Sequence, residues 1–225
     1  MVTLNQRLKK VSTYITGETL ADIGSDHAYL PIYALENNLV KKAIAGEVIK
    51  GPFEASVKNV IEHKLSPYID VRLGDGLSVL NPNEQINCVT ICGMGGPLIA
   101  KIIKNGQAKL TSHPRLILQS NIQSSAIRRL LIHMNYVIVE EAILEEKGHI
   151  YEIIVADYSE TKQKLSESEI KFGPILLKNK TDLFFKKWEH ECASLNKIKS
   201  HLDHHKHNNR LIEINNEINL INEVL

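Results

Sequence analysis

The sequence predicts an α/β fold in which a mostly parallel, seven-stranded sheet is followed by a smaller helical domain. Short apolar runs alternate with amphipathic segments over residues 1–157, and residues 211–225 repeat apolar side chains with heptad spacing. Alternating strands and helices require a sheet that is covered on both faces. The heptad pattern, in contrast, indicates a pair of packed helices.

The first element is expected to be a helix over residues 3–15, where Leu4, Leu8, Val11 and Ile15 recur at spacings of 4, 3 and 4. From there, strands and helices alternate. Strands are predicted at residues 19–23, 43–47, 69–73, 87–92, 115–119, 136–143 and 150–156. Helices are predicted near residues 27–38, 52–64, 96–104 and 123–134.

The last two strands are separated only by residues 144–149, which leave no room for a helix. We therefore expect them to form an antiparallel hairpin at the edge of the sheet.

After Asp157 the chain changes in character, because residues 158–169 are polar and predict a linker. Apolar residues then recur near heptad positions on both sides of the polar stretch 204–209, at Trp188, Leu195, Ile198 and Leu202 and at Leu211, Ile214, Ile218, Ile221 and Leu225. We expect residues 1–157 to form one domain. Residues 158–225 are expected to form a linker and an antiparallel coiled-coil hairpin.

Composition excludes several classes of protein. No apolar run approaches the ~20 residues of a membrane-spanning helix, and the N-terminus is too polar for a signal peptide, so we expect a cytoplasmic protein. The 3 cysteines lack paired spacing, which argues against a disulfide framework or structural zinc, and we expect no metal. The net charge of +1 does not by itself indicate a nucleic-acid-binding protein, although the basic cluster at Arg7, Lys9 and Lys10 would suit either phosphate contacts or a solvated helix face.

Acidic and glycine residues stand where successive strands are expected to end. Asp22 and Gly24 close the first strand, Glu47 the second, Asp75 follows the third, and a glycine-rich turn at 93–96 follows the fourth. The carboxyl ends of parallel strands meet at one edge of the sheet, where open α/β sheets bind ligands. The sequence therefore predicts a cleft for a small charged ligand.

The chain carries seven distinctive motifs at 22–31 (Asp-Ile-Gly-Ser-Asp-His-Ala-Tyr-Leu-Pro), 46–48 (Gly-Glu-Val), 51–53 (Gly-Pro-Phe), 74–76 (Gly-Asp-Gly), 93–96 (Gly-Met-Gly-Gly), 118–121 (Leu-Gln-Ser-Asn) and 173–174 (Gly-Pro). Together these motifs closely resemble the bacterial tRNA (adenine-22) N1-methyltransferase family over nearly the whole chain. The resemblance implies a class I, Rossmann-like methyltransferase domain, S-adenosylmethionine as methyl donor, and N1 of a D-arm adenine in tRNA as acceptor.

Each part of that cofactor needs a different partner. Asp22 and the amides around Gly24 and Ser25 suit the methionine end, while Glu47 can accept from both ribose hydroxyls. Asp75 can accept from the adenine amine, although a lone Asp after a strand more often has a turn or capping role. The remaining cofactor-binding candidates are His27, Val48, Gly76, Gly93 and Met94.

Asp26 is the candidate catalytic residue. Asp26 and Ala28 occupy the later glycine positions of the general Asp/Glu-x-Gly-x-Gly-x-Gly loop, so Asp26 brings an extra carboxylate to the edge of the cleft. That carboxylate could stabilise positive charge on the methylated base or assist loss of an N6 proton. The alternative is that it caps the helix that begins at Ala28.

The acceptor atom N1 lies on the Watson–Crick edge, so the enzyme must bind an unpaired adenine or extrude it. Tyr29 is a candidate for stacking on that base, with core packing as the alternative, and Gln119 and Asn121 are candidates for hydrogen bonds to its edge. Arg7 is the fourth substrate-binding candidate. The motif at 93–96 differs from the Asn/Asp-Pro-Pro-Tyr of N6-adenine enzymes, which disfavours methylation of the exocyclic amine.

Other functions remain open from the residues alone. The alternatives are another S-adenosylmethionine-dependent RNA methyltransferase and a non-catalytic RNA-binding scaffold. A nicotinamide-dependent dehydrogenase is disfavoured because Gly-x-Gly-x-x-Gly is missing after the first strand, and a P-loop nucleotidase lacks Gly-Lys-Ser/Thr. We expect a monomer, although the heptads would serve a dimer equally well.

Overall fold

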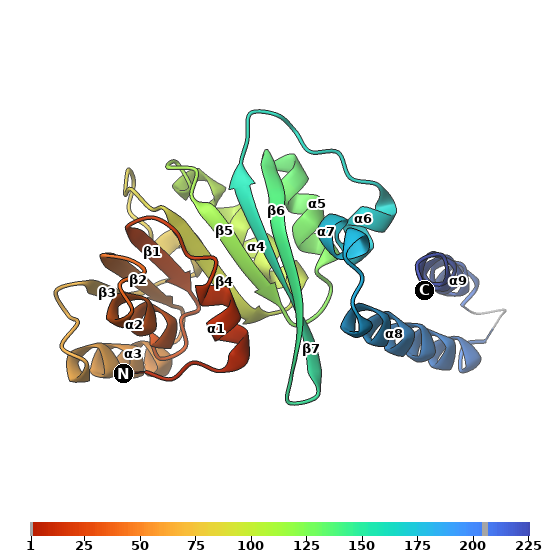
Figure 1. Ribbon diagram of the computed structural model, residues 1–225, viewed down its shortest axis with the longest axis horizontal. Coiled ribbons are helices and arrows are strands. Elements are labelled where there is room, and N and C mark those ends of the chain that lie inside the picture. Colours follow the sequence, from red (N-terminus) through yellow and green to blue (C-terminus); the bar gives the residue numbers. More distant parts are fainter. Residues whose placement is uncertain (1, 204–206) are drawn as a thin grey trace. The chain divides into compact units, whose positions relative to one another are not determined.

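The computed structural model describes residues 2–203 and 207–225 of the chain. Its centre is a 7-stranded sheet with the strand order β3-β2-β1-β4-β5-β7-β6 (Figure 1). β7 runs antiparallel to both of its neighbours, β5 and β6, so the predicted hairpin at the edge of the sheet is confirmed. The strands are β1 (Thr19–Ile23), β2 (Lys42–Glu47), β3 (Ile69–Leu73), β4 (Cys88–Met94), β5 (Arg115–Ser120), β6 (Tyr136–Glu146) and β7 (His149–Tyr158).

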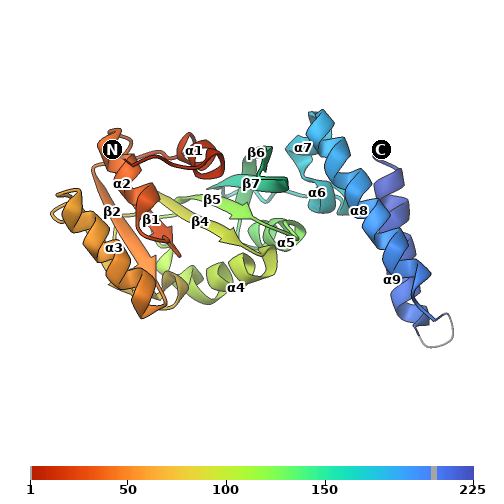
Figure 2. The same ribbon diagram turned by 90° about the horizontal axis from the view of Figure 1, so that it is seen from below.

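Helices cover both faces of this sheet, as the alternating pattern predicts. Figure 2 shows α1 and α2 on one side of the strands and α4 and α5 on the other, and α3 packs on β2 and β3. The helices are α1 (Gln6–Ser12), α2 (Tyr29–Glu36), α3 (Lys50–Glu62), α4 (Gly96–Gly106) and α5 (Ser125–His133). Helix α1 is shorter than the predicted 3–15, because the Asn5 side chain caps it by accepting from the backbone amide of Leu8 at 2.8 Å.

The side chains beneath α1, α2 and α3 form one continuous apolar core. Leu20 of β1, Ile117 of β5 and Val11 of α1 are fully buried in it. Burial of such side chains is the main stabilising term in folding. It fixes the strands whose carboxyl ends carry the predicted cleft.

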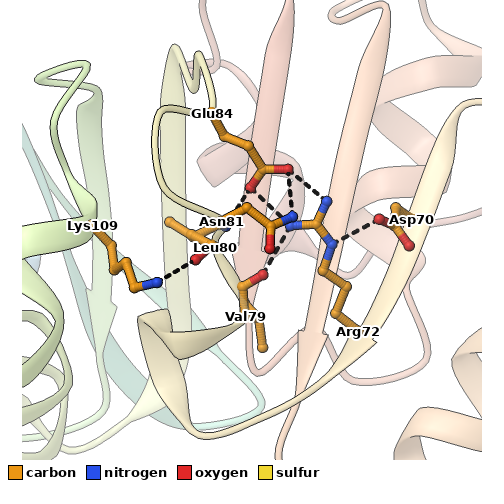
Figure 3. A network of polar contacts seen from close by, with 7 residues as sticks. All are labelled: Asp70, Arg72, Val79, Leu80, Asn81, Glu84 and Lys109. Atoms are coloured by element: carbon orange, nitrogen blue, oxygen red, sulfur yellow. Dashed lines mark hydrogen bonds and ion pairs between the residues drawn. The ribbon is translucent and has the colours of Figure 1, made fainter.

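The connection from β3 to β4 is the one crossover within the described sheet domain that has 3-10 helix η1 (Gly76–Val79) in place of an α-helix. An ion-pair network holds it instead (Figure 3). Arg72 binds both carboxylate oxygens of Glu84, at 2.8 and 2.6 Å, and donates to Asp70 at 2.7 Å. Hydrogen bonding from Arg72 lowers the pKa of Glu84 to about 2. The network fixes the segment that carries Asp75.

The chain divides into two compact units, Met1–Leu165 and Ser166–Leu225. The second unit contains α6 (Glu167–Phe172), α7 (Pro174–Lys178), α8 (Asp182–Ser200) and α9 (Asn208–Asn222), while η2 (Gln107–Lys109) follows α4 in the first. The predicted bounds of the linker, 158 and 169, are both wrong. At its start, β7 continues to Tyr158, and at its end a capping box between Ser166 and Glu169 starts α6.

Helices α8 and α9 pack against each other, as the heptads predict. The repeat in α9 is buried at Leu211, Ile214, Ile218 and Ile221. Two predicted core positions are wrong: Ile198 is 46% exposed and Leu225 is 45% exposed, and Val224 is buried in place of the latter. Of the expected turn at 204–209, residues 204–206 lie outside the described residues. No described helix is both long and apolar enough to cross a membrane.

Candidate functional site

The predicted cleft residues lie at one edge of the sheet. Strands β1 to β5 are parallel, so their carboxyl ends share this edge, and the strand order reverses between β1 and β4. Asp22, Glu47 and Met94 belong to the last residues of β1, β2 and β4. Ligands bind at such a switch point in open α/β sheets. The topology therefore assembles the site that the sequence predicts.

Asp22 anchors the loop that follows β1. It is 4% exposed, and its carboxylate accepts from the hydroxyls of Ser25 at 2.7 Å and Thr90 at 2.5 Å. Burial raises the pKa of Asp22 to about 6. Thr90 was missed by the sequence reasoning, although a hydroxyl inside the apolar run 87–92 was a visible signal.

The amides of this loop correct one expectation. Gly24 and Ser25 both donate their backbone N–H to the carbonyl of Gly46, at 2.9 and 3.2 Å. These amides are engaged within the protein, which differs from the expected role as donors to a ligand. Gly24 has φ +72°, a conformation that favours glycine, and a Cβ there would lie 2.4 Å from Cε of Met94, so a larger residue would be strained and would displace the end of the methionine side chain.

Three successive residues in this loop have left-handed backbone conformations. Asp26, His27 and Ala28 have φ angles of 46°, 68° and 57°. Such conformations cost of order 1–3 kcal/mol each and cluster at functional sites. The amide of Asn59 supports the loop by donating to the carbonyl of His27 at 2.9 Å.

This conformation turns the loop side chains toward solvent. The side chain of Asp26 is 85% exposed, and no described side chain caps α2, so the capping alternative is wrong. The rings of His27 and Tyr29 stack with centroids 5.4 Å apart, and Tyr29 is 42% exposed. The core-packing alternative for Tyr29 is therefore also wrong.

Glu47 carries the clearest sign of a missing partner. It is only 6% exposed, and burial raises the pKa of its carboxyl. Its Oε1 is buried without a hydrogen-bond partner among the described residues. A buried unsatisfied carboxylate oxygen is costly, and a ligand hydroxyl would satisfy it.

The neighbouring candidates lie along the same edge. Val48 is 60% exposed next to Glu47. Asp75 and Gly76 line a cavity of about 370 Å³, together with Leu98 and Lys101. An exposed apolar side chain beside a carboxylate is a surface that a purine base can occupy.

The turn after β4 is held by a polar network. The amide of Gly93 donates to Oε1 of Gln119 at 2.8 Å, Arg7 donates to the same oxygen, and Asn121 donates to the carbonyl of Gly93 at 2.8 Å. The side-chain amide of Gln119 donates to Oδ1 of Asn121 at 3.1 Å. The guanidinium of Arg7 also lies 5.5 Å from the ring of Tyr151, a contact that sequence reasoning missed.

This network changes the roles expected from the sequence. Gln119 is fully buried with both ends of its amide engaged, so we reassign it from a contact with the base to a residue that positions Gly93. Asn121 is exposed, but its two polar atoms are engaged as well. Among the described residues, no group of His, Cys, Asp and Glu is arranged to hold a metal ion.

Comparison with known proteins decides the family. The family model described as TrmK, tRNA (adenine(22)-N(1))-methyltransferase, matches residues 20–223. The chain belongs to the tRNA (adenine(22)-N(1))-methyltransferase family. A TrmK-family member of that name from Bacillus subtilis is 40% identical over 231 residues, which cover 99% of this chain and 97% of the relative.

Solved structures of TrmK-type proteins share the whole fold. The B. subtilis m1A22 tRNA methyltransferase TrmK is 39% identical with a TM-score of 0.92, covering 100% of this chain and 99% of its own. A Streptococcus pneumoniae protein solved with S-adenosyl-L-methionine is 40% identical with a TM-score of 0.90, covering 99% and 100% of the two chains. M. capricolum TrmK, solved with S-adenosyl-homocysteine, is 34% identical with a TM-score of 0.89, covering 98% and 96%.

Proposed function

We propose that this chain transfers a methyl group from S-adenosylmethionine to N1 of adenine 22 in the tRNA D-arm. The single observation that carries the proposal is the buried Oε1 of Glu47 at the end of β2, for which the described part of the chain provides no hydrogen-bond partner. This oxygen can accept from a ribose hydroxyl of the cofactor, and the chain belongs to the tRNA (adenine(22)-N(1))-methyltransferase family.

The cofactor is held by residues from three strand ends. Glu47 would accept from the ribose hydroxyls, Asp75 would accept from the adenine amine, and Val48 would pack on the adenine ring. Gly76, Gly93 and Met94 shape the cleft around it. Asp22 and Ser25 act by fixing the first loop, which leaves room at Gly24 for the methionine end. The bound cofactor supplies an electrophilic methyl group on sulfonium sulfur.

The residues on the acceptor side orient the base and balance charge. Adenine N1 is a neutral ring nitrogen, so attack on the methyl group mainly requires alignment and exclusion of water. Tyr29, stacked on His27 and exposed, offers an aromatic face for the base. Positive charge then develops on the adenine, and Asp26 stabilises it or accepts an N6 proton.

The second unit, Ser166–Leu225, is proposed to contribute to tRNA binding. It contains several exposed lysines, including Lys178 and Lys197, which can contact phosphates. We further propose that the enzyme acts as a monomer in the cytoplasm, where its tRNA substrate is found.

Mass spectrometry of nucleosides tests this function. The purified chain is incubated with S-adenosylmethionine and unmodified tRNA, and the modified position is mapped in nuclease fragments. We expect 1-methyladenosine at position 22, and no product on a control tRNA in which adenine 22 is replaced by guanine. Methylation at N6, at another position, or of the control tRNA would overturn the proposal.

A further inference from the structure

Ile122 has a large apolar side chain that is exposed to solvent next to the proposed methyl-transfer site. It is 63% exposed and lies two residues after the end of β5, in the turn that leads into α5. A single exposed isoleucine is common on protein surfaces and means little alone. Ile122 differs from other exposed isoleucines because hydrogen bonds of the backbone fix the turn that carries it.

Hydrogen bonds connect the turn after β5 to the turn after β4. The amide of Gly96 donates to the carbonyl of Ile122 at 2.8 Å, and the amide of Asn121 donates to the carbonyl of Met94 at 2.8 Å. Gln123, which follows, has a left-handed φ of 55°. These constraints fix the direction of the Ile122 side chain, so little freedom is lost when a ligand packs on it.

Two glycines allow the close approach of these turns. A Cβ at Gly96 would lie 2.1 Å from the carbonyl oxygen of Gln123, so no larger residue fits there. A Cβ at Gly95 would lie 3.6 Å from Cγ1 of Ile122, which places the isoleucine beside this glycine. Gly95 adjoins Met94, whose side chain reaches Gly24 of the first loop. Ile122 therefore stands on the same edge as the cofactor-binding loops.

The polar residues nearby are already engaged. Asn121 accepts from Gln119 and donates to Gly93, so its side-chain amide is held in the turn. Beside it, the turn presents the exposed apolar side chain of Ile122. Enzymes that act on an extruded base hold it by stacking it between aromatic or apolar side chains.

We propose that Ile122 packs against the face of the extruded target adenine and holds it in the methyl-transfer site. The inference rests on the proposed function, since it assigns the base contact of that reaction. Extruding a base costs a few kcal/mol. A fixed apolar surface offsets part of that cost without reading any base edge, and the N1 edge remains free for the reaction.

Fluorescence of 2-aminopurine at position 22 of the tRNA tests the proposal, because unstacking raises its emission. With the wild-type chain we expect a rise on complex formation. With Ile122→Ala that rise should fall by at least about half, and kcat/KM on unmodified tRNA should fall about tenfold, the effect of a small apolar contact. The affinity for S-adenosylmethionine, measured by calorimetry, should not change. Ile122→Leu should restore both readouts.

Ile61→Ala is the matched control, since Ile61 is 60% exposed on α3 and lies within the same unit. If Ile122→Ala matches this control in fluorescence and in kcat/KM, the proposal is wrong. The wild-type assay separates the two claims. Wild-type methylation of adenine 22 with an unaffected Ile122→Ala variant overturns only the role of Ile122, whereas a wild-type chain that methylates no tRNA overturns the function and the inference with it.

Discussion

Glu47 shows how a single side chain can point to a proposed binding site. Its carboxylate is 6% exposed and has one oxygen without a hydrogen-bond partner among the described residues, and a ligand that donates to this oxygen would offset the cost of its burial. The strain at Asp26, His27 and Ala28 has a similar meaning, because a left-handed run is retained where surrounding contacts fix it.

We expect Glu47→Ala to weaken binding of S-adenosylmethionine by ~1–3 kcal/mol, since the ligand loses a buried acceptor. Asp75→Ala should weaken it less, because Asp75 is exposed. Calorimetry measures both affinities, with Glu62→Ala as a control from the exposed end of α3. If neither Glu47→Ala nor Asp75→Ala differs from this control, the cofactor assignment is incorrect.

Asp26→Asn should slow methyl transfer by about tenfold in single turnover, because it removes the negative charge and keeps the size of the side chain. The expected loss of rate is only about tenfold because solvent screens the charge of the Asp26 side chain, which is 85% exposed. The rate is measured at saturating cofactor and tRNA. A rate equal to that of the wild type would mean that this carboxylate has no part in the transfer step.

At the scale of elements, apolar periodicity predicted every strand and the five helices of the first unit, because burial of one face is the dominant constraint on each. Side-chain roles at strand ends were less predictable. Gln119 was expected to bind substrate, but its amide is engaged by Gly93 and Asn121. Such a network depends on the distance between strands that are neighbours only in the folded sheet. Sequence spacing does not contain it.

The helical unit shows a second limit of sequence reasoning. A strict heptad continues to Leu225, but Val224 is buried instead, because α9 ends at Asn222 and the residues that follow no longer keep the helical repeat. The capping box at Ser166 was hidden in a polar stretch that resembles a linker, although Ser-x-x-Glu is a recognisable start signal for a helix.

A buried ion cluster joins α5 to the β6–β7 hairpin. Arg128 contacts Glu141 and Glu152 at 2.7 Å each, and all three side chains are almost fully buried. Arg128→Ala should destabilise the first unit by about 3–5 kcal/mol, because it leaves buried carboxylates without this partner. Urea unfolding measures the change.

Lys58→Ala, which breaks an exposed pair on α3, is the control for this substitution and should cost no more than ~0.5 kcal/mol. If both variants lose a similar free energy of unfolding, the buried cluster does not stabilise the first unit as proposed.

At the scale of the whole molecule, the division between Leu165 and Ser166 separates the residues proposed to bind the cofactor from the helical unit. Deleting residues 166–225 should therefore leave the affinity for S-adenosylmethionine nearly unchanged, while methylation of tRNA falls strongly. Calorimetry and a tRNA methylation assay measure the two effects, and circular dichroism checks that the truncated chain is folded. Full methylation by a folded truncated chain would exclude a role of the second unit in tRNA binding.

The position of β7 between β5 and β6 has a consequence for the synthesis of this protein. β6 leaves the ribosome before β7 but pairs only with β7 in the finished sheet. β6 therefore stays unpaired until residue 158 has emerged from the ribosome, whereas β1 to β5 can already assemble. During that interval β5 presents an open apolar edge, so the nascent chain is most exposed to misassembly just before its sheet is complete.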